Sequence, residues 1–330
     1  MIEITKVKNR TWSMLGARRT FGAALEEMSA GWDRLFVMSA DLKTSSGLDR
    51  FANSYPHRYL SGGIAEQNMV CVASGLASEG KVVFISSFSP FMTGRCYDQI
   101  RVHLGMMGHN VKLVGIGSGL GLGPQGNTHY GLDDVSLMCT VPNMTVIVPA
   151  DCAEVVKATE AAYFHDGPVY LRLCGESNTP IINKEDYDYR IGKAIRLREG
   201  NDVAILASGP LVYQALKAAE ILAGEGLSVA VTNVHTVKPL DTQAVDEALT
   251  AKLIVTVEEN FIHGGLSSMV LRYLSGKAGV PPVLSLGVDD VFPPAGSYPY
   301  MLEQLGLSGE KIAAAVKGKM ERRDNGLEKQ

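Results

Sequence analysis

The sequence predicts an α/β protein with two doubly wound domains, and three observations support this fold class. Short runs of branched apolar residues alternate with segments of helical periodicity, which is typical of parallel α/β sheets. The 330 residues are enough to bury two cores of ordinary size. A polar stretch over residues 176–200 interrupts the alternation once. We therefore expect one sheet domain before this stretch and a second one after it.

The first domain is expected over residues 11–180. Its apolar runs are short enough for strands, and its longer segments have the apolar spacing of a buried helix face. The expected strands are residues 34–38, 81–86, 111–116, 145–148 and 169–173, and the expected helices are residues 20–29, 66–78 and 153–164. Ligands of such sheets bind beyond the carboxyl ends of the strands, so the residues just after each strand are the candidates for chemistry.

The second domain is expected over residues 195–320. Three further runs predict strands, namely DVAILASG, LSVAVTNV and KLIVTVEEN, and helices are expected at residues 211–224 and 241–251. The charged residues 321–330 are expected to form a disordered tail, as chain termini commonly do.

Composition narrows the class of protein. The net charge of −4 gives no electrostatic reason to expect nucleic acid or a membrane surface as a partner. We find no apolar run long enough for a membrane span and no signal peptide at the N-terminus. The five cysteines lack the spacing of a metal site, so we interpret them as reduced thiols. These features predict a cytoplasmic protein.

Three polar residues stand near expected strand ends or helix starts. Asp41 and Ser45 follow the first strand, where such residues either cap the next segment or contact a ligand. Glu66 stands at the start of an apolar helix, behind Gly62 and Gly63. A carboxylate there is stabilised by the helix dipole by about 0.3–1 kcal/mol, and this local interpretation is the simpler one. The functional alternative requires Glu66 to face an apolar pocket and hold a proton for a ligand.

Aromatic and glycine-rich segments follow the next two strands. Phe88 and Phe91 are spaced like core residues, yet at a strand end their rings can also stack on a flat heterocycle. The segment GLGPQG, residues 121–126, formally matches GxGxxG, but no apolar helix opens at its third glycine. We therefore favour a loop that presents His129 to a pocket, although a lone histidine is more often structural.

Taken in order, these motifs resemble the C-terminal half of transketolase. They are SADL, GGIAEQNM, FSPFMTGRCYDQIR, GLGPQGNTHYGLDD, MTVIVPAD and VEENFIHGGLSS. The resemblance is greatest to split transketolases, in which this half is a separate chain. It implies a pyrimidine-binding domain followed by a transketolase C-terminal domain.

The resemblance also implies a cofactor and a partner. Enzymes of this family use thiamine diphosphate, and a GDG motif marks the domain that holds the diphosphate and a divalent metal. This sequence has no GDG. We therefore expect no metal ligand here, and expect Mg²⁺ (or Ca²⁺) on an N-terminal partner subunit in an α2β2 assembly. The chain alone should be inactive.

By residue matches, Glu66 corresponds to the acid that contacts N1′ of the aminopyrimidine. Phe91 corresponds to the ring that stacks on the pyrimidine, with Phe88 beside it. Asp41 corresponds to an acid near the thiazolium, and His129 to a histidine that binds the donor sugar. Two more residues, Arg18 and Ser45, correspond to positions that contact the phosphate of the acceptor sugar.

The sequence departs from the family pattern at three positions. The usual histidine at the start of the glycine-rich loop is Gly117, and the acid that reads the acceptor's 2-hydroxyl is Gln125. The arginine that clamps phosphate is Gly175. Loss of that clamp removes about 1.5–3 kcal/mol of hydrogen bonding to a charged group. We therefore expect a sugar other than an ordinary pentose phosphate: modified, larger, nucleotide-linked or sulfonated. Arg172 either supplies a shifted positive charge or is solvated.

Other functions share parts of this pattern. The β subunit of a 2-oxo acid dehydrogenase has similar length and shares the AEQ acid, but the contexts GNTHYG and YDQIR favour transketolase. A synthase resembling deoxyxylulose phosphate synthase is normally one long chain. A scaffold without catalysis would not need Glu66, Phe91 and His129 together.

Overall fold

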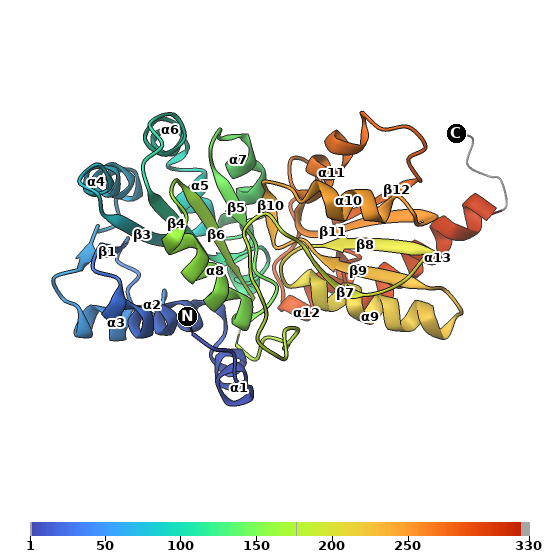
Figure 1. The fold of residues 1–330 in the computed structure, drawn as a ribbon, viewed down its shortest axis with the longest axis horizontal. Helices are drawn as coiled ribbons and strands as arrows, with labels where there is room; N and C mark the ends of the chain where they lie inside the picture. The colour runs from blue at the N-terminus through green and yellow to red at the C-terminus, as the bar shows by residue number, and fades with distance from the viewer. Residues whose placement is uncertain (1, 176, 325–330) are drawn as a thin grey trace.

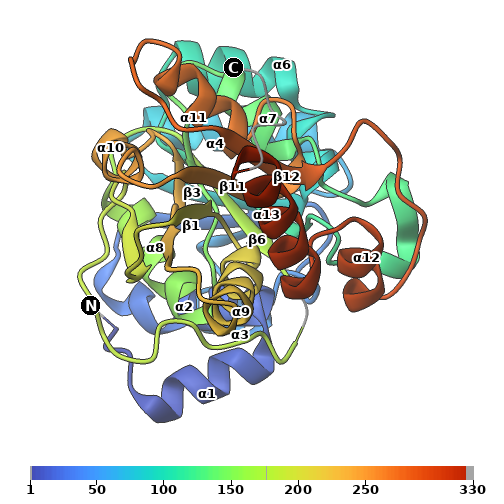
Figure 2. The same ribbon diagram turned by 90° about the vertical axis from the view of Figure 1, so that its right-hand side faces the viewer.

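The computed structural model describes residues 2–175 and 177–324. Two sheets, each covered by helices, lie side by side along the long axis of the molecule (Figure 1). The view along that axis shows the helices distributed around the strands (Figure 2). The mixed α/β architecture with mainly parallel strands confirms the predicted fold class.

The first sheet has the order β10-β5-β6-β4-β3-β1-β2, and its pairs are parallel except for β10 with β5. Its central strands are buried along their length, as expected for a sheet covered on both faces. Its strands from the first half of the chain are β1 (Leu35–Ser39), β2 (Tyr59–Ser61), β3 (Val82–Phe88), β4 (Val111–Ser118), β5 (Thr145–Ile147) and β6 (Val169–Cys174).

Helices of this half cover the sheet and lead into it. They are α1 (Lys6–Leu15), α2 (Ala17–Met28), α3 (Asp49–Ser54), α4 (Glu66–Ser78), α5 (Ser89–Thr93), α6 (Tyr97–Gln99), α7 (Asp134–Thr140) and α8 (Cys152–Phe164). Three further helical segments belong to this half: the 3-10 helix η1 (Ser29–Gly31), the π-helix η2 (Ile100–Met106) and the 3-10 helix η3 (Gly123–Thr128). The α8 helix begins where Asp151 accepts a hydrogen bond from the backbone of Glu154.

The second sheet has the order β12-β11-β8-β9-β7, with β7 antiparallel to β9. Its strands are β7 (Ile195–Arg198), β8 (Val203–Ala207), β9 (Val229–Asn233), β11 (Leu253–Phe261) and β12 (Val283–Val288). Its helices are α9 (Leu211–Gly224), α10 (Thr242–Ala248), α11 (Leu266–Leu274), α12 (Tyr298–Gln304) and α13 (Gly309–Asp324).

One strand joins the two halves. β10 (Thr236–Lys238) comes from the second half of the chain but pairs antiparallel with β5, at the edge of the first sheet. The Lys238 ammonium donates to the carbonyls of Cys139 (2.9 Å) and Val141 (2.6 Å). The division of the chain into domains at residues 180 and 195 stays a prediction. The sequence did not predict that a strand from the second half of the chain joins the first sheet.

The predicted strands and helices are confirmed within a few residues, and the 66–78 helix has the predicted bounds. The tail is one exception, because α13 continues through residues 321–324, while residues 325–330 lie outside the described part. None of the helices within the described ranges is long and apolar enough to cross a membrane.

Candidate functional site

The candidate site lies at the carboxyl end of β3, where the chain turns into α5, and beside the first residue of α4. The glycine pair before α4 has two different tasks. A Cβ on Gly62 would lie 3.1 Å from the sulfur of Met69, so this residue permits close packing of the loop on the helix. Gly63 has a φ of +62°, a conformation in which a side chain is strained. The pair therefore lets the chain turn tightly into Glu66.

Glu66 is the first residue of α4, and only 3% of it is exposed. The hydroxyl of Ser87, near the end of β3, donates to its Oε1 at 3.1 Å. Nη1 of Arg95 donates to its Oε2 at 2.7 Å in an ion pair. A buried carboxylate needs such partners, since burying it unpaired would cost several kcal/mol. Glu66 is therefore a buried, fully engaged acid rather than a solvated cap.

Three aromatic side chains gather beside this acid. The ring centroids of Phe88 and Phe91 are 6.1 Å apart, and the ring of His129 lies 5.7 Å from the first and 5.4 Å from the second. All three pairs have the edge-to-face geometry that aromatic rings prefer. The guanidinium of Arg95 lies 4.4 Å from the centroid of Phe91, so the acid and the aromatic group are contiguous.

The glycine-rich loop that carries His129 is pinned at its base. Gly119 and Gly131 pair across the loop as an isolated antiparallel bridge. Glu259 of β11 accepts the backbone N–H of Leu120 at 2.6 Å, and a Cβ on Gly119 would overlap that carboxylate. The loop then forms the 3-10 turn η3 instead of an α-helix. No α-helix therefore opens at the third glycine, unlike in a dinucleotide-binding GxGxxG loop, and the loop brings His129 against the two phenylalanines.

The prediction for Arg172 is wrong in both of its forms. Its side chain is 1% exposed, and its Nε contacts both carboxylate oxygens of Asp134 at 2.9 and 3.0 Å. Its Nη2 donates to the carbonyls of Gly131 (2.6 Å) and Glu259 (2.8 Å). Arg172 is thus neither solvated nor available to a substrate. It ties the end of the glycine-rich loop to β11 of the second sheet.

A polar pocket of about 280 Å³ lies at the N-terminus of α2. Arg18 and Ser45, both predicted, line it together with Gly175. The neighbouring hollow, of about 480 Å³, is lined by Arg18 and Gln125. The structure therefore brings these predicted substrate contacts to adjoining pockets, and the additional lining residues Arg19, Thr44 and Ser177 were missed.

Two of the three positions that depart from the family pattern, Gly117 and Gly175, have backbone conformations suited to glycine. Gly117 has a φ of +61°, and a Cβ there would lie 2.7 Å from Leu122. Gly175 has a φ of +82°. A side chain at either position would be strained in this backbone conformation.

Asp41 lies two residues after the end of β1 and is exposed, with a φ of +56°. The left-handed conformation is tolerated by aspartate better than by most residues. Its place beside a cofactor stays a prediction. Ser87 and Arg95 were not identified as site residues from the sequence, although both lie in or beside quoted motifs. Their only sequence signal is their position near Phe88 and Phe91.

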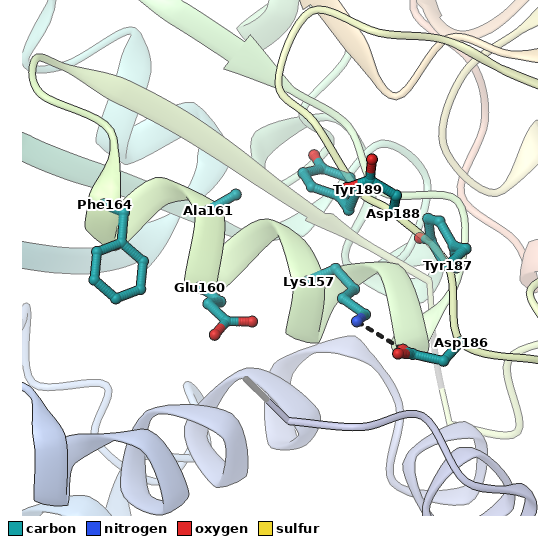
Figure 3. Close-up of a pocket in the computed structure, with 8 residues that line it drawn as sticks. All are labelled: Lys157, Glu160, Ala161, Phe164, Asp186, Tyr187, Asp188 and Tyr189. Carbon is teal, nitrogen blue, oxygen red and sulfur yellow. Dashed lines mark ion pairs between the residues drawn. The ribbon is translucent and has the colours of Figure 1, made fainter.

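A larger hollow, of about 520 Å³, lies elsewhere, between α8 and residues 186–189 (Figure 3). Lys157 and Asp186 form an ion pair of 2.6 Å at its wall. None of the predicted site residues lines it. Among residues 2–175 and 177–324 we find no group of three His, Cys, Asp or Glu side chains that could hold a metal ion.

Comparison with protein families gives two matches. Residues 13–179 match the transketolase pyrimidine-binding domain, and residues 192–312 match the transketolase C-terminal domain.

Individual proteins agree with these matches. The chain is 40% identical to the 6-deoxy-6-sulfo-D-fructose transketolase subunit SqwH of Clostridium sp. (strain MSTE9), over 93% of this chain and 95% of that one. It is 31% identical to an apulose-4-phosphate transketolase subunit of Phocaeicola vulgatus, over 91% and 96% of the two chains. A solved structure described as a split gene transketolase, inactive beta4 tetramer, superposes with a TM-score of 0.83 at 35% identity, over 92% and 97% of the chains.

Proposed function

The chain belongs to the transketolase family as a subunit of the split type, and from this premise we propose that it transfers a two-carbon ketol unit between sugars together with an N-terminal subunit. The observation that carries the proposal is the cluster of Glu66, Phe88, Phe91 and His129 at one strand end. Binding of an aminopyrimidine requires an acid beside an aromatic ring on which the heterocycle can stack. Thiamine diphosphate, when bound, supplies the nucleophilic carbon that cleaves and forms the bond next to a carbonyl.

Within this proposal Glu66 shares a proton with N1′ of the aminopyrimidine. Its burial supports this role, because little water reaches a side chain that is 3% exposed, so a ring nitrogen can contact the carboxyl group directly. The hydrogen bond from Ser87 fixes Oε1 and so orients the carboxyl group. Phe91 stacks on the pyrimidine, with Phe88 at its edge and Asp41 near the thiazolium. His129, held in contact with both rings, hydrogen-bonds the donor sugar.

The partner is an N-terminal subunit that holds the diphosphate and the Mg²⁺ (or Ca²⁺), because this sequence has no GDG motif. Exposed apolar side chains beside the site support an interface there. Ile64 precedes α4, and Val72 lies on its outer face, with exposures of 78% and 40%. Met106 and Met107 are exposed at the end of η2, which packs against α4. An apolar surface of this kind is typical of a protein interface, and we propose an α2β2 assembly.

The substrate is proposed to be a sugar with an anionic end that is not an ordinary pentose phosphate. Arg18 and Ser45 bind the anionic end, and Gln125 lies toward the sugar hydroxyls in the adjoining pocket. Gly175 leaves this pocket without the family's clamping arginine. A phosphate carries a charge of about −1.5 to −2 at neutral pH, whereas a sulfonate carries a single charge and needs fewer cations. The similarity to a sulfofructose transketolase subunit gives the sulfonated sugar first place.

Steady-state kinetics of the reconstituted two-chain enzyme test the proposal. We expect a higher kcat/KM with 6-deoxy-6-sulfofructose as donor than with xylulose 5-phosphate plus ribose 5-phosphate. Strong activity with the pentose phosphates would refute the non-standard substrate. Pyruvate-dependent reduction of a dichloroindophenol acceptor would instead assign a 2-oxo acid dehydrogenase subunit.

A further inference from the structure

Arg95 contacts both groups that an aminopyrimidine would use. Its Nη1 lies 2.7 Å from Oε2 of Glu66, and its Cζ lies 4.4 Å from the centroid of Phe91. Oε1 of Glu66 already accepts the hydroxyl of Ser87. The guanidinium contacts the other oxygen, Oε2, and also lies against Phe91, so a ring nitrogen that approached Oε2 over the Phe91 ring would meet it.

The chemistry of the two groups is alike. A guanidinium is a flat, delocalised cation that stacks on aromatic rings and donates N–H groups from its edge. A protonated or imino aminopyrimidine is also flat, stacks on an aromatic ring and meets a carboxyl oxygen through its edge. Glu66 and Phe91 are thus complementary to either partner.

We infer that Arg95 occupies the aminopyrimidine position in the free subunit and must leave it before the cofactor binds. This inference rests on the proposed function. Only the side chain needs to move, because the backbone carbonyl of Arg95 is held in place by a hydrogen bond from Nε2 of Gln67 on α4, at 3.1 Å. The side chain is 45% exposed, so solvent is open to it on departure.

Two effects of opposite sign follow. In the free subunit the guanidinium of Arg95 pairs with the buried carboxylate of Glu66, so Arg95 stabilises the fold. In the assembled enzyme the same contact lowers the fraction of sites that are open, and the apparent Kd rises by that factor. A residue that only supports Glu66 would instead strengthen both the fold and cofactor binding.

The test compares Arg95→Gln with Arg101→Gln. Arg101 pairs with Asp98 at 2.8 Å on the surface and provides a matched loss of one positive charge. Urea unfolding of the isolated subunit measures stability. Isothermal titration of thiamine diphosphate and Mg²⁺ into the complex with the N-terminal subunit measures Kd.

For Arg95→Gln we expect a lower urea midpoint and a Kd that is roughly tenfold smaller, equivalent to about 1.4 kcal/mol. Arg101→Gln should change neither. An equal or larger Kd for Arg95→Gln overturns the inference. Failure of the wild-type complex to bind thiamine diphosphate would contradict the proposed function instead. If Arg95→Gln does not fold, Arg95→Lys replaces it, and its Kd must also fall because a lysine stacks less well on Phe91.

Discussion

Replacing Arg172 with methionine would remove a cation that joins the two sheets while keeping a side chain of similar length. The guanidinium is 1% exposed, contacts both oxygens of Asp134 and donates to the carbonyls of Gly131 and Glu259. The variant leaves the Asp134 carboxylate buried, with Tyr170 as its remaining side-chain donor at 2.6 Å. Breaking a buried pair in this way costs about 3–5 kcal/mol.

The assay is urea unfolding of the isolated chain, monitored by circular dichroism. Arg190→Met is the matched control, because Arg190 pairs with Asp188 while both side chains are largely exposed. The control should change the free energy of unfolding by less than about 0.5 kcal/mol. The double variant Arg172→Met with Asp134→Asn should lose less than the sum of the single variants, since it leaves neither charge of this pair buried alone. Equal effects of Arg172→Met and Arg190→Met would refute the reasoning.

Three further outcomes are expected. In the reconstituted enzyme Glu66→Gln should lower kcat by about 10²–10⁴-fold, which is the usual range for the loss of a proton-transfer group. The control Glu79→Gln, at the exposed end of the same helix, should leave kcat unchanged. An unchanged kcat for Glu66→Gln would contradict a catalytic role for Glu66. Arg18→Gln should raise KM for the anionic sugar by roughly 10–100-fold with little change in kcat. The control Arg10→Gln, at an exposed position, should leave KM unchanged. A wild-type KM for Arg18→Gln would contradict the assignment of Arg18 to the substrate pocket. Burial raises the pKa of Glu154 from 4.5 to about 7, so between these pH values the folded state keeps a proton that the unfolded state releases, and stability falls as pH rises from 4.5 to 7. Urea midpoints measured across this pH range should therefore fall less steeply for Glu154→Gln than for the wild type. An unaltered slope would contradict the assignment of this pH dependence to Glu154.

The sequence allows those candidate residues that depend on chain order to be placed on the fold. Glu66, Phe88 and Phe91 each stand at the junction of a strand and a helix, and such junctions can be read from apolar runs. His129 could be placed on the loop because no helical pattern follows its glycines. The structure brings the two rings and the imidazole into contact.

What the sequence did not reveal depends on contacts between distant segments. Arg95 and Ser87 reach Glu66 across 29 and 21 residues, and no local pattern shows which carboxylate an arginine will meet. Arg172 stands in an apolar run where solvent and a buried partner are equally compatible with the alternation. Its partner, Asp134, lies 38 residues earlier. Only the fold decides these pairs.

The shared strand has a consequence for how the protein can be divided. β10 closes the edge of the first sheet by pairing with β5 through Thr236–Ile147 and Lys238–Val146. A fragment that stops at the apparent boundary near residue 180 would leave β5 with an open row of backbone hydrogen-bonding groups. Unpaired edges of this kind attract strands of other chains. The pyrimidine-binding half expressed by itself would therefore be prone to aggregate. In the whole chain β10 of the second half covers this edge and prevents such pairing.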